Sequence, residues 1–400
     1  MTLALVLWGL AWGGVFTGPY NLDPWPPLSD PFAFFQGVRA LLPVAAAYFC
    51  LLWALAAKVR FRFGLTALGL FVAYGAIGFI ASVLYSPETV TSLYWASAYL
   101  APLLVAWFII ERPEPLPVLR AIERANVAVI LALMVILLPE AYRFGFGHST
   151  RFEIYQMPFG LGEVRANGVG RYAVIVLIAA GVSLVSSASK KRLLWLPVVV
   201  PALFLLMQTQ SRSSLLGLAV ASALFVVVRG LNLRFLIAGP AVAYVIYVSG
   251  VTWRARGALS SLVFLTGRDT TWQKGLARIG ESPLFGWGFH ADRLLLNKEH
   301  MHNSYLHAGM QAGVPGALLF GAGMAVLWLF LWRNGVLRRI RTAAPPDQGL
   351  LMQAVLILGF LTARSLFEST AAFYGVDLLL FVPAAAYLYQ WAYEHPEPQP

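Results

Sequence analysis

Long apolar runs alternate with short polar segments along almost the whole chain. The runs are about twenty residues long, and apolar residues do not alternate with polar ones inside them, which is typical of membrane-spanning helices and not of β-barrel strands. The predicted spans are 2–18, 32–57, 64–85, 92–110, 122–140, 171–188, 193–209, 214–229, 235–250, 308–332, 350–367 and 376–393. The pattern therefore predicts an all-α polytopic membrane protein with about 12 transmembrane helices in one transmembrane domain, residues 1–400.

Composition agrees with this class and charge gives it an orientation. Of the 400 residues, 59% are hydrophobic and only 12% are charged, a surface that a soluble protein of this length could not solvate. Basic clusters such as 58–62 and 189–192 fall in alternate loops, and placing them in the cytoplasm puts both termini there. The apolar N-terminus has no basic n-region, so we interpret it as a retained span. The single Cys50 lies in an apolar run, which excludes a disulfide framework and a cysteine-based metal site.

One stretch, residues 266–316, departs from this pattern by being polar, aromatic and rich in glycine. It carries four of the six histidines. Most of it belongs to a predicted external loop, 251–307, in which we expect short helices around 269–280 and 290–300. A membrane protein does not need such a segment for anchoring, so it is the first place to look for chemistry.

A second polar segment, Gln208 to Ser214, lies between two apolar spans. It reads QTQSRSS. It could be a solvated turn, but Arg212 at the bilayer edge is costly unless it is paired. With an anionic ligand, the same group becomes a phosphate clamp.

The sequence TGRDTTW at 266–272 predicts a helix that begins near residue 269. Thr266 or Asp269 would cap this helix, and Arg268 would project from its N-terminal end, where free N–H groups favour an anion. The alternative is a surface ion pair between Arg268 and Asp269, with Trp272 as an interfacial anchor.

The sequence HMHNSY at 300–305 offers a candidate general base. An imidazole can take a proton from a hydroxyl group near neutral pH. His300 and His302 would point to different faces of a helix, and the spacing does not decide which of them acts. Either histidine could instead be a helix-start residue bonded to the backbone. A histidine pair is also a metal fragment, but zinc needs three or four ligands, and His290, Asp292 and His307 add no helpful spacing; we predict no metal site.

Several further polar residues accompany these segments. Arg364 and Glu368 are four apart at the end of a span, where they would pair on one helix face, or orient His302, or hold the ligand. Arg165 precedes Asn167 at the start of another span and could lie at the mouth of a cavity. Arg39, inside the second span, could pair with an acidic group or line the cavity.

Three motifs resemble those of the O-antigen ligase/O-antigen polymerase superfamily of bacterial membrane glycosyltransferases. QTQSRSSLLGL at 208–218 resembles the T-x-S-R-G span start, with Ser213 in place of glycine. TGRDTTWQKGLARIGESPLFGWGFH at 266–290 resembles the GR-x-x-x-W and P-L-x-G-x-G elements. HNSYLHAGMQAGVPGALLF at 302–320 resembles the H-N-x-Y-L and G-x-x-G elements. RANGVGRYA at 165–173 is a weaker match.

The resemblance implies a fold of the membrane glycosyltransferase C type in the bacterial inner membrane, with the active site facing the periplasm. It implies inverting, metal-independent transfer of a glycan from undecaprenyl diphosphate to an acceptor hydroxyl, either lipid A–core or a growing glycan. No cofactor and no nucleic-acid partner are expected. Arg212 and Arg268 would bind the diphosphate and His302 would act as base. Asn303, Tyr305, Arg364, Glu368, Trp272 and Arg165 would support them.

Three alternatives stay open. The residues do not decide between a ligase and a polymerase, because both use the same donor. Metal-dependent relatives use paired acids in the first external loop, but here that loop offers only Asp23 and Asp30, separated by prolines. A transporter or flippase of lipid-linked glycans would also use arginines to guide an anion, although transporters place their charged sites near the bilayer midplane.

Overall fold

The computed structural model describes residues 1–19, 25–59, 66–145, 150, 153–186, 190–230 and 268–396. The chain divides into two compact units. The first consists of Met1–Ile122, Gly267–Asn334 and Ser365–Pro400, and the second consists of Glu123–Thr266 and Gly335–Arg364. Each unit is described by itself.

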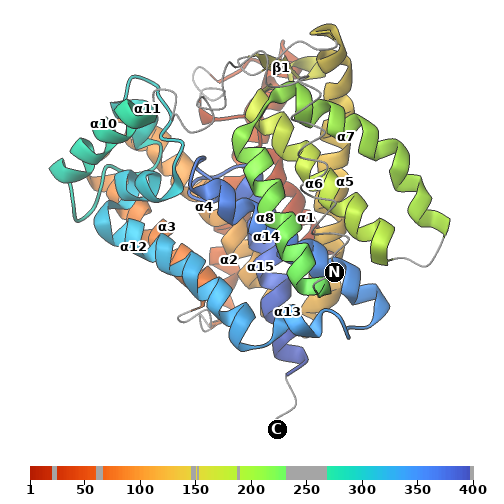
Figure 1. The fold of residues 1–400 in the computed structure, drawn as a ribbon. Coiled ribbons are helices and arrows are strands. Elements are labelled where there is room, and N and C mark those ends of the chain that lie inside the picture. The colour runs from red at the N-terminus through yellow and green to blue at the C-terminus, as the bar shows by residue number, and fades with distance from the viewer. Residues whose placement is uncertain are drawn as a thin grey trace. The chain divides into compact units, whose positions relative to one another are not determined.

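All secondary-structure elements described in the first unit are helices. Its helices are α1 (Thr2–Gly13), α2 (Pro31–Ala56), α3 (Ala67–Leu84), α4 (Thr89–Ile110), α10 (Arg268–Glu281), α11 (Ala291–Leu295), α12 (Ser304–Arg333) and α15 (Val376–Glu394). Figure 1 shows α12 running beside α3, with the short helices α10 and α11 at one end of this pair.

Buried aromatic side chains form the core between α3, α12 and α15. The Phe71 ring lies with its centroid 5.3 Å from that of Phe320 and 5.4 Å from that of Phe381, both in edge-to-face contact. Tyr74, one turn along α3 from Phe71, is fully buried and its hydroxyl donates to the Ala372 carbonyl at 2.7 Å. Edge-to-face pairs of this kind add to the burial of large apolar surface. This core packs α3, α12 and α15 against one another.

A kink in α12 is filled by the segment 282–290. Ala312 and Gly313 leave helical geometry, with a φ of 67° at Gly313. The Trp287 amide donates to the Met310 carbonyl at 2.8 Å, and the Val314 amide donates to the Pro283 carbonyl at 2.7 Å. These bonds satisfy backbone groups that the kink releases from the helix. The glycine-rich motif therefore forms a backbone-to-backbone joint that anchors the polar stretch to α12.

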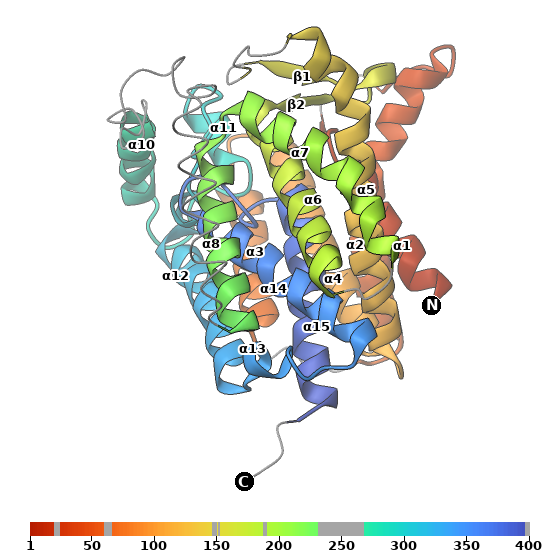
Figure 2. The same cartoon turned by 45° about the vertical axis from the view of Figure 1, so that its right-hand side comes forward.

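The second unit contains most of α5 (Pro115–Arg143), which crosses the boundary between the units, and the helices α6, α7, α8, α13 and α14. Their bounds are α6 (Ala166–Ser186), α7 (Leu196–Thr209), α8 (Arg212–Arg229), α13 (Val336–Arg339) and α14 (Pro345–Ser365). The described residues of this unit also form two 3-10 helices, Pro158–Gly160 and Lys190–Trp195. In Figure 2, α6 and α7 run side by side.

The structure agrees with the predicted helical class, and the second unit adds a small β-hairpin to its helices. Strands β1 (Ile154–Gln156) and β2 (Glu163–Arg165) pair antiparallel, with Tyr155 opposite Val164. Both of these residues are buried, while their neighbours on the strands are exposed. Such alternation is the two-residue period of a half-buried strand. The hairpin leads directly into α6.

Eight helices of the described part of the chain are long and apolar enough to cross a membrane. They are α2, α3, α4, α5, α6, α8, α12 and α14. Two shorter apolar helices, α1 and α7, fall on predicted spans, α15 falls on the last one, and the predicted span 235–250 lies outside the described residues. The chain is therefore an integral membrane protein with several spanning helices, and the total of twelve stays a prediction.

Two predicted elements are shorter in the structure than expected, and a third agrees with its prediction. Helix α1 ends at Gly13, so the first apolar helix is shorter than the predicted span 2–18. The short helix predicted around 269–280 is confirmed as α10. The one predicted around 290–300 is only α11, Ala291–Leu295, because the following residues form the turns that hold the histidine loop.

Candidate active site

The start of α12 fixes the backbone around His302. Asn303 caps the helix, since its Oδ1 accepts hydrogen bonds from the amides of Tyr305 and Leu306, both at 3.0 Å. Its Nδ2 also donates to the Leu366 carbonyl at 3.1 Å. His302, directly before the cap, has a φ of 49°, in the left-handed region. A non-glycine residue is uncommon there and is often found at functional sites.

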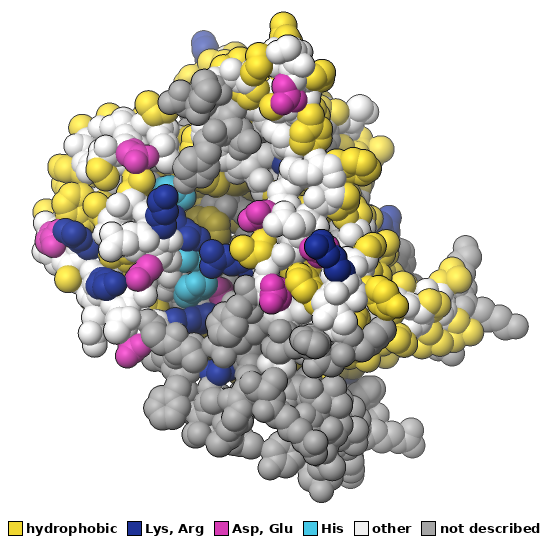
Figure 3. All heavy atoms as spheres, turned by 90° about the horizontal axis from the view of Figure 1, so that it is seen from above, with side chains coloured by type: hydrophobic (Ala, Val, Ile, Leu, Met, Phe, Trp, Pro, Cys, Tyr) yellow, Lys and Arg dark blue, Asp and Glu magenta, His cyan; other side chains and the backbone are white. Residues whose placement is uncertain are grey.

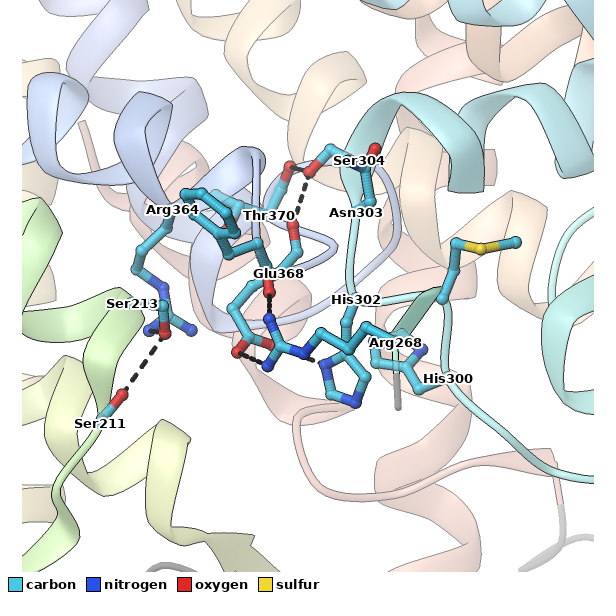
Figure 4. A network of polar contacts seen from close by, with 12 residues as sticks. Ser211, Ser213, Arg268, His300, His302, Asn303, Ser304, Arg364, Glu368 and Thr370 are labelled. Atoms are coloured by element: carbon cyan, nitrogen blue, oxygen red, sulfur yellow. Dashed lines mark hydrogen bonds and ion pairs between the residues drawn. The ribbon is translucent and has the colours of Figure 1, made fainter. Parts of the chain in front are cut away.

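Ser304 ties this turn to the segment after α14. Its buried hydroxyl lies 2.9 Å from the Glu368 carbonyl oxygen and 2.8 Å from that of Thr370. These contacts fix the backbone of Glu368 beside the cap. Figure 4 shows the result, in which the side chains of Glu368 and His302 point toward one another.

His302 and Glu368 form a hydrogen-bonded pair. Nδ1 of His302 lies 2.8 Å from Oε2 of Glu368, and the two side chains are 27% and 8% exposed. Because a carboxylate only accepts, Nδ1 carries the proton in this bond and Nε2 is left with a free lone pair. Burial lowers the pKa of His302, although the Glu368 carboxylate acts in the opposite direction. A neutral imidazole at neutral pH is the form that can accept a proton.

Arg268 shares the Glu368 carboxylate. Its Nη2 lies 3.1 Å from Oε1 of Glu368, and its Nη1 donates to the Phe367 carbonyl. Arg268 is the first residue of α10, at its N-terminal end as predicted. Thr266, one of the two expected capping residues, lies outside the described residues. Arg268 pairs with Glu368, in contrast to the alternative of a surface pair with Asp269. A guanidinium has five N–H donors, so two such bonds leave donors for an anion.

Helix α10 also contacts the loop between α11 and α12. Trp272 donates from Nε1 to the Met301 carbonyl at 2.8 Å, which makes it a support for the loop as well as an aromatic surface residue. The Met301 side chain is fully buried against α10, where a Cβ at Gly275 would lie 2.1 Å from its Cε atom. Tyr305 lies at the edge of this group, where its hydroxyl accepts a hydrogen bond from the Ser365 hydroxyl at 3.4 Å.

Asp292 orients the second histidine of the loop. Its Oδ2 lies 2.7 Å from Nδ1 of His300, and its Oδ1 lies 3.5 Å from Nε2 of His307. The carboxylate is buried, which by itself would raise its pKa, but the neighbouring imidazoles of His307 and His300 outweigh burial and lower the pKa. His300 and His302 are not on a helix, and their ring centroids lie 4.9 Å apart.

These three residues are also the described group that could hold a metal ion. One ligand atom from each of Asp292, His300 and His307 lies within 4.8 Å of the others. Their chemistry, two imidazoles and one carboxylate, suits zinc or a similar metal. However, the carboxylate already accepts hydrogen bonds from the backbone amides of Met301 and Arg293, at 3.2 and 2.9 Å. Its oxygens are therefore engaged by N–H donors, as expected for an orienting carboxylate.

In the second unit, the QTQSRSS segment forms a tight turn between α7 and α8. Gln210 adopts left-handed geometry with a φ of 48°, and Ser211 caps α8. All of its residues except Arg212 are buried, so the interpretation as a solvated turn is wrong. Gln208 donates to the carbonyls of Ala141 and Gly145, at 3.0 and 3.2 Å. Arg212 is half-buried at the first position of α8, where the helix dipole favours an anion.

Arg364 binds two serines of the QTQSRSS segment. Its Nη1 donates to the hydroxyls of Ser213 and Ser214, at 3.3 and 3.1 Å, and its side chain is buried. The expectation that Arg364 and Glu368 share a helix face is wrong, because α14 ends at Ser365 and Glu368 lies beyond it. The alternative role for Glu368, orienting His302, agrees with its geometry.

Three other predicted residues belong to other elements. Arg165 is exposed at the end of β2 in the second unit. Arg39 is half-buried on α2. Asp30, one of the two acids of the first external loop, caps α2 by accepting from the Ala33 amide at 3.0 Å; Asp23 lies outside the described residues.

The first unit thus gathers Arg268, Trp272, His302, Asn303, Tyr305 and Glu368 into one site. The sequence pattern places Asp292 only among the candidate metal ligands and does not predict its hydrogen bond to His300. Its position two residues after the SPLFGWGFH motif was the signal that could have found it.

Comparison with known proteins supports the interpretation of the three motifs. No curated protein matches the chain. The family model described as O-antigen ligase matches residues 197–321, which include all three motifs. This match, which covers less than half of the chain, confirms the resemblance of residues 197–321 to the O-antigen ligase/polymerase superfamily.

Proposed function

We propose that this protein transfers a glycan from undecaprenyl diphosphate to a hydroxyl of lipid A–core, with His302 as the general base. The observation that carries the proposal is the His302–Glu368 pair, in which Nδ1 is bound at 2.8 Å and Nε2 remains free to accept a proton. The proposal places the reaction on the periplasmic side of the bacterial inner membrane, with both termini in the cytoplasm, because the basic loops then lie inside.

In this mechanism the acceptor hydroxyl attacks the anomeric carbon of the donor while Nε2 of His302 takes its proton. A glycosidic bond forms, the bond between the anomeric carbon and the phosphate oxygen breaks, and its electron pair leaves with the lipid diphosphate. Attack from the face opposite the leaving group inverts the anomeric centre. The Glu368 carboxylate stabilises the imidazolium that forms, as the acidic member of other catalytic triads does.

Arg268 would stabilise the leaving diphosphate. Negative charge grows on the phosphate oxygens as the bond breaks, so a fixed guanidinium stabilises the transition state more than the ground state. The Arg268 side chain is 23% exposed and has donors beyond those used by Glu368 and Phe367. Arg212 is proposed as a second diphosphate ligand on the basis of its motif and its place at the start of α8.

The test uses purified protein with synthetic undecaprenyl-diphosphate glycan, with and without lipid A–core, and mass analysis of the products. A ligase gives glycosylated lipid A–core. A polymerase gives longer lipid-linked glycans without that acceptor, and a transporter changes no product mass in either arm. His302→Ala should abolish transfer while the protein remains folded and inserted. Near wild-type transfer by that variant would exclude His302 as the base.

A further inference from the structure

A second imidazole beside the proposed base is arranged in the same way as the base. The rings of His300 and His302 lie 4.9 Å apart at an angle of 71°. Each has Nδ1 within hydrogen-bond distance of a buried carboxylate, at 2.7 Å to Asp292 and at 2.8 Å to Glu368. Figure 3 shows that histidine side chains reach the surface of the molecule on this face.

The Asp292 carboxylate sets the tautomer of His300. It is 1% exposed and accepts hydrogen bonds from the Met301 and Arg293 amides as well as from His300. With this set of donors the group is a carboxylate that accepts, so Nδ1 of His300 carries the proton. Nε2 of His300 is therefore an acceptor, and it has no hydrogen-bond partner within the described part of the chain. The side chain is 15% exposed, so a ligand can reach it.

The ring of His300 is also held in place by packing. It lies edge-to-face against Phe373 and His307, with centroid distances of 5.4 Å to each. An imidazole used only for packing needs no buried carboxylate on Nδ1. An imidazole that must present Nε2 in one direction needs such an orienting group, as ligating and catalytic histidines do.

We propose that His300 is a second contact for the acceptor sugar, in which Nε2 accepts a hydrogen bond from a hydroxyl adjacent to the one that His302 deprotonates. This inference rests on the proposed function. Two neighbouring lone pairs, one on each imidazole, are complementary to a pair of hydroxyl groups on adjacent carbons of one sugar ring. The His300 contact determines which hydroxyl reaches His302, and Asp292 acts as its positioning residue.

The experiment compares lipid A–core with versions whose outermost sugar lacks one hydroxyl at a time, using undecaprenyl-diphosphate glycan as donor. One missing hydroxyl abolishes transfer because it is the attacking group. Loss of the adjacent hydroxyl should lower the wild-type kcat/KM about tenfold, the effect of one hydrogen bond. His300→Ala should lower kcat/KM for unmodified lipid A–core by a similar factor. This variant should then have the same kcat/KM for lipid A–core and for the version that lacks the adjacent hydroxyl.

His300→Phe is the second variant, because it keeps the ring contact with Phe373 and removes the acceptor nitrogen. His395→Ala is the matched control, since His395 packs on Trp391 at the end of α15 and should leave the discrimination unchanged. Unaltered discrimination in both His300 variants would overturn the inference.

The two proposals fail in different ways. If the wild-type protein glycosylates no acceptor, the proposed function fails. If it does, but the His300 variants discriminate as it does, only the inference about His300 fails. If chelation removes the discrimination and Zn²⁺ restores it, the cluster of Asp292, His300 and His307 is a metal site and the assignment to an acceptor hydroxyl is wrong.

Discussion

Glu368 holds His302 through one carboxylate oxygen and Arg268 through the other. The distances are 2.8 Å from Oε2 to Nδ1 of His302 and 3.1 Å from Oε1 to Nη2 of Arg268. One carboxylate thus fixes both the proposed base and a proposed diphosphate ligand. The base and the anion ligand therefore depend on the same residue, which makes Glu368 the most informative position to change.

Glu368→Gln should reduce kcat by about a hundredfold or more while the KM for the donor changes little. The amide keeps the shape but cannot stabilise an imidazolium, and its NH₂ group would favour the wrong tautomer of His302. Steady-state transfer assays on the purified variant measure both constants.

The matched control is Glu299→Gln. Glu299 also pairs with a cation on α10, at 3.3 Å from Lys274, but both side chains are largely exposed. Exposed pairs contribute little, so this variant should behave as wild type. Equal activity of the two variants would argue against a role for Glu368.

Arg268→Lys should lower kcat/KM at least tenfold although the charge is kept. Lysine cannot reproduce the planar fork that binds Glu368, the Phe367 carbonyl and a phosphate group together. The control on the same helix is Arg278→Lys, because the Arg278 side chain forms an exposed pair with Glu281 at 2.8 Å. A silent Arg268→Lys variant would contradict bidentate recognition of the diphosphate.

Replacing Glu368 should shift the pH dependence of kcat/KM in a defined direction. Activity is expected to fall as pH drops through the pKa of His302, because the imidazolium cannot accept a proton. Glu368 raises the pKa of His302, against the lowering by burial, His300 and Arg268. Glu368→Gln should therefore shift the acidic limb of kcat/KM to lower pH. A shift to higher pH would show that another group controls this limb.

Gly286→Ala should destabilise the protein by about 2–5 kcal/mol. Gly286 has a φ of 68°, and a Cβ there would lie 2.6 Å from the Gly313 nitrogen and the Met310 carbonyl oxygen, both backbone atoms that cannot move aside. The apparent melting temperature in detergent measures the effect.

Gly280→Ala on α10 is the control for this substitution. A Cβ at Gly280 would have no described atom within 4 Å, so alanine should be neutral or stabilise the helix by up to about 1 kcal/mol. Equal melting temperatures of the two variants would mean that the joint between 282–290 and α12 does not limit stability.

Transfer should survive treatment with a metal chelator. The proposed mechanism uses guanidinium groups for the diphosphate and an imidazole for the proton, and it gives no step to a metal. Activity is measured after dialysis against chelator and again after addition of Mg²⁺, Mn²⁺ or Zn²⁺. Loss of activity that one of these ions restores would contradict the metal-independent mechanism.

The sequence by itself determined that the chain is a helical membrane protein and which stretches carry polar chemistry. The hydrophobic runs are long enough to fix the class, and capping and helix-end chemistry are local, so α10 and the polar start of α12 could be predicted near their observed positions. The local sequence also showed that Arg268 and His302 belong to recognisable motifs.

Only the tertiary structure decided which of these residues act together. Glu368 is 66 residues from His302 and 100 from Arg268, and α14 ends before it, so helical spacing suggested a different partner. The Asp292–His300 pair depends on the turns after α11, and the joint between 282–290 and α12 depends on a backbone kink. Contacts of this kind arise from how helices pack and bend, whereas a local pattern reports only the conformation of its own segment.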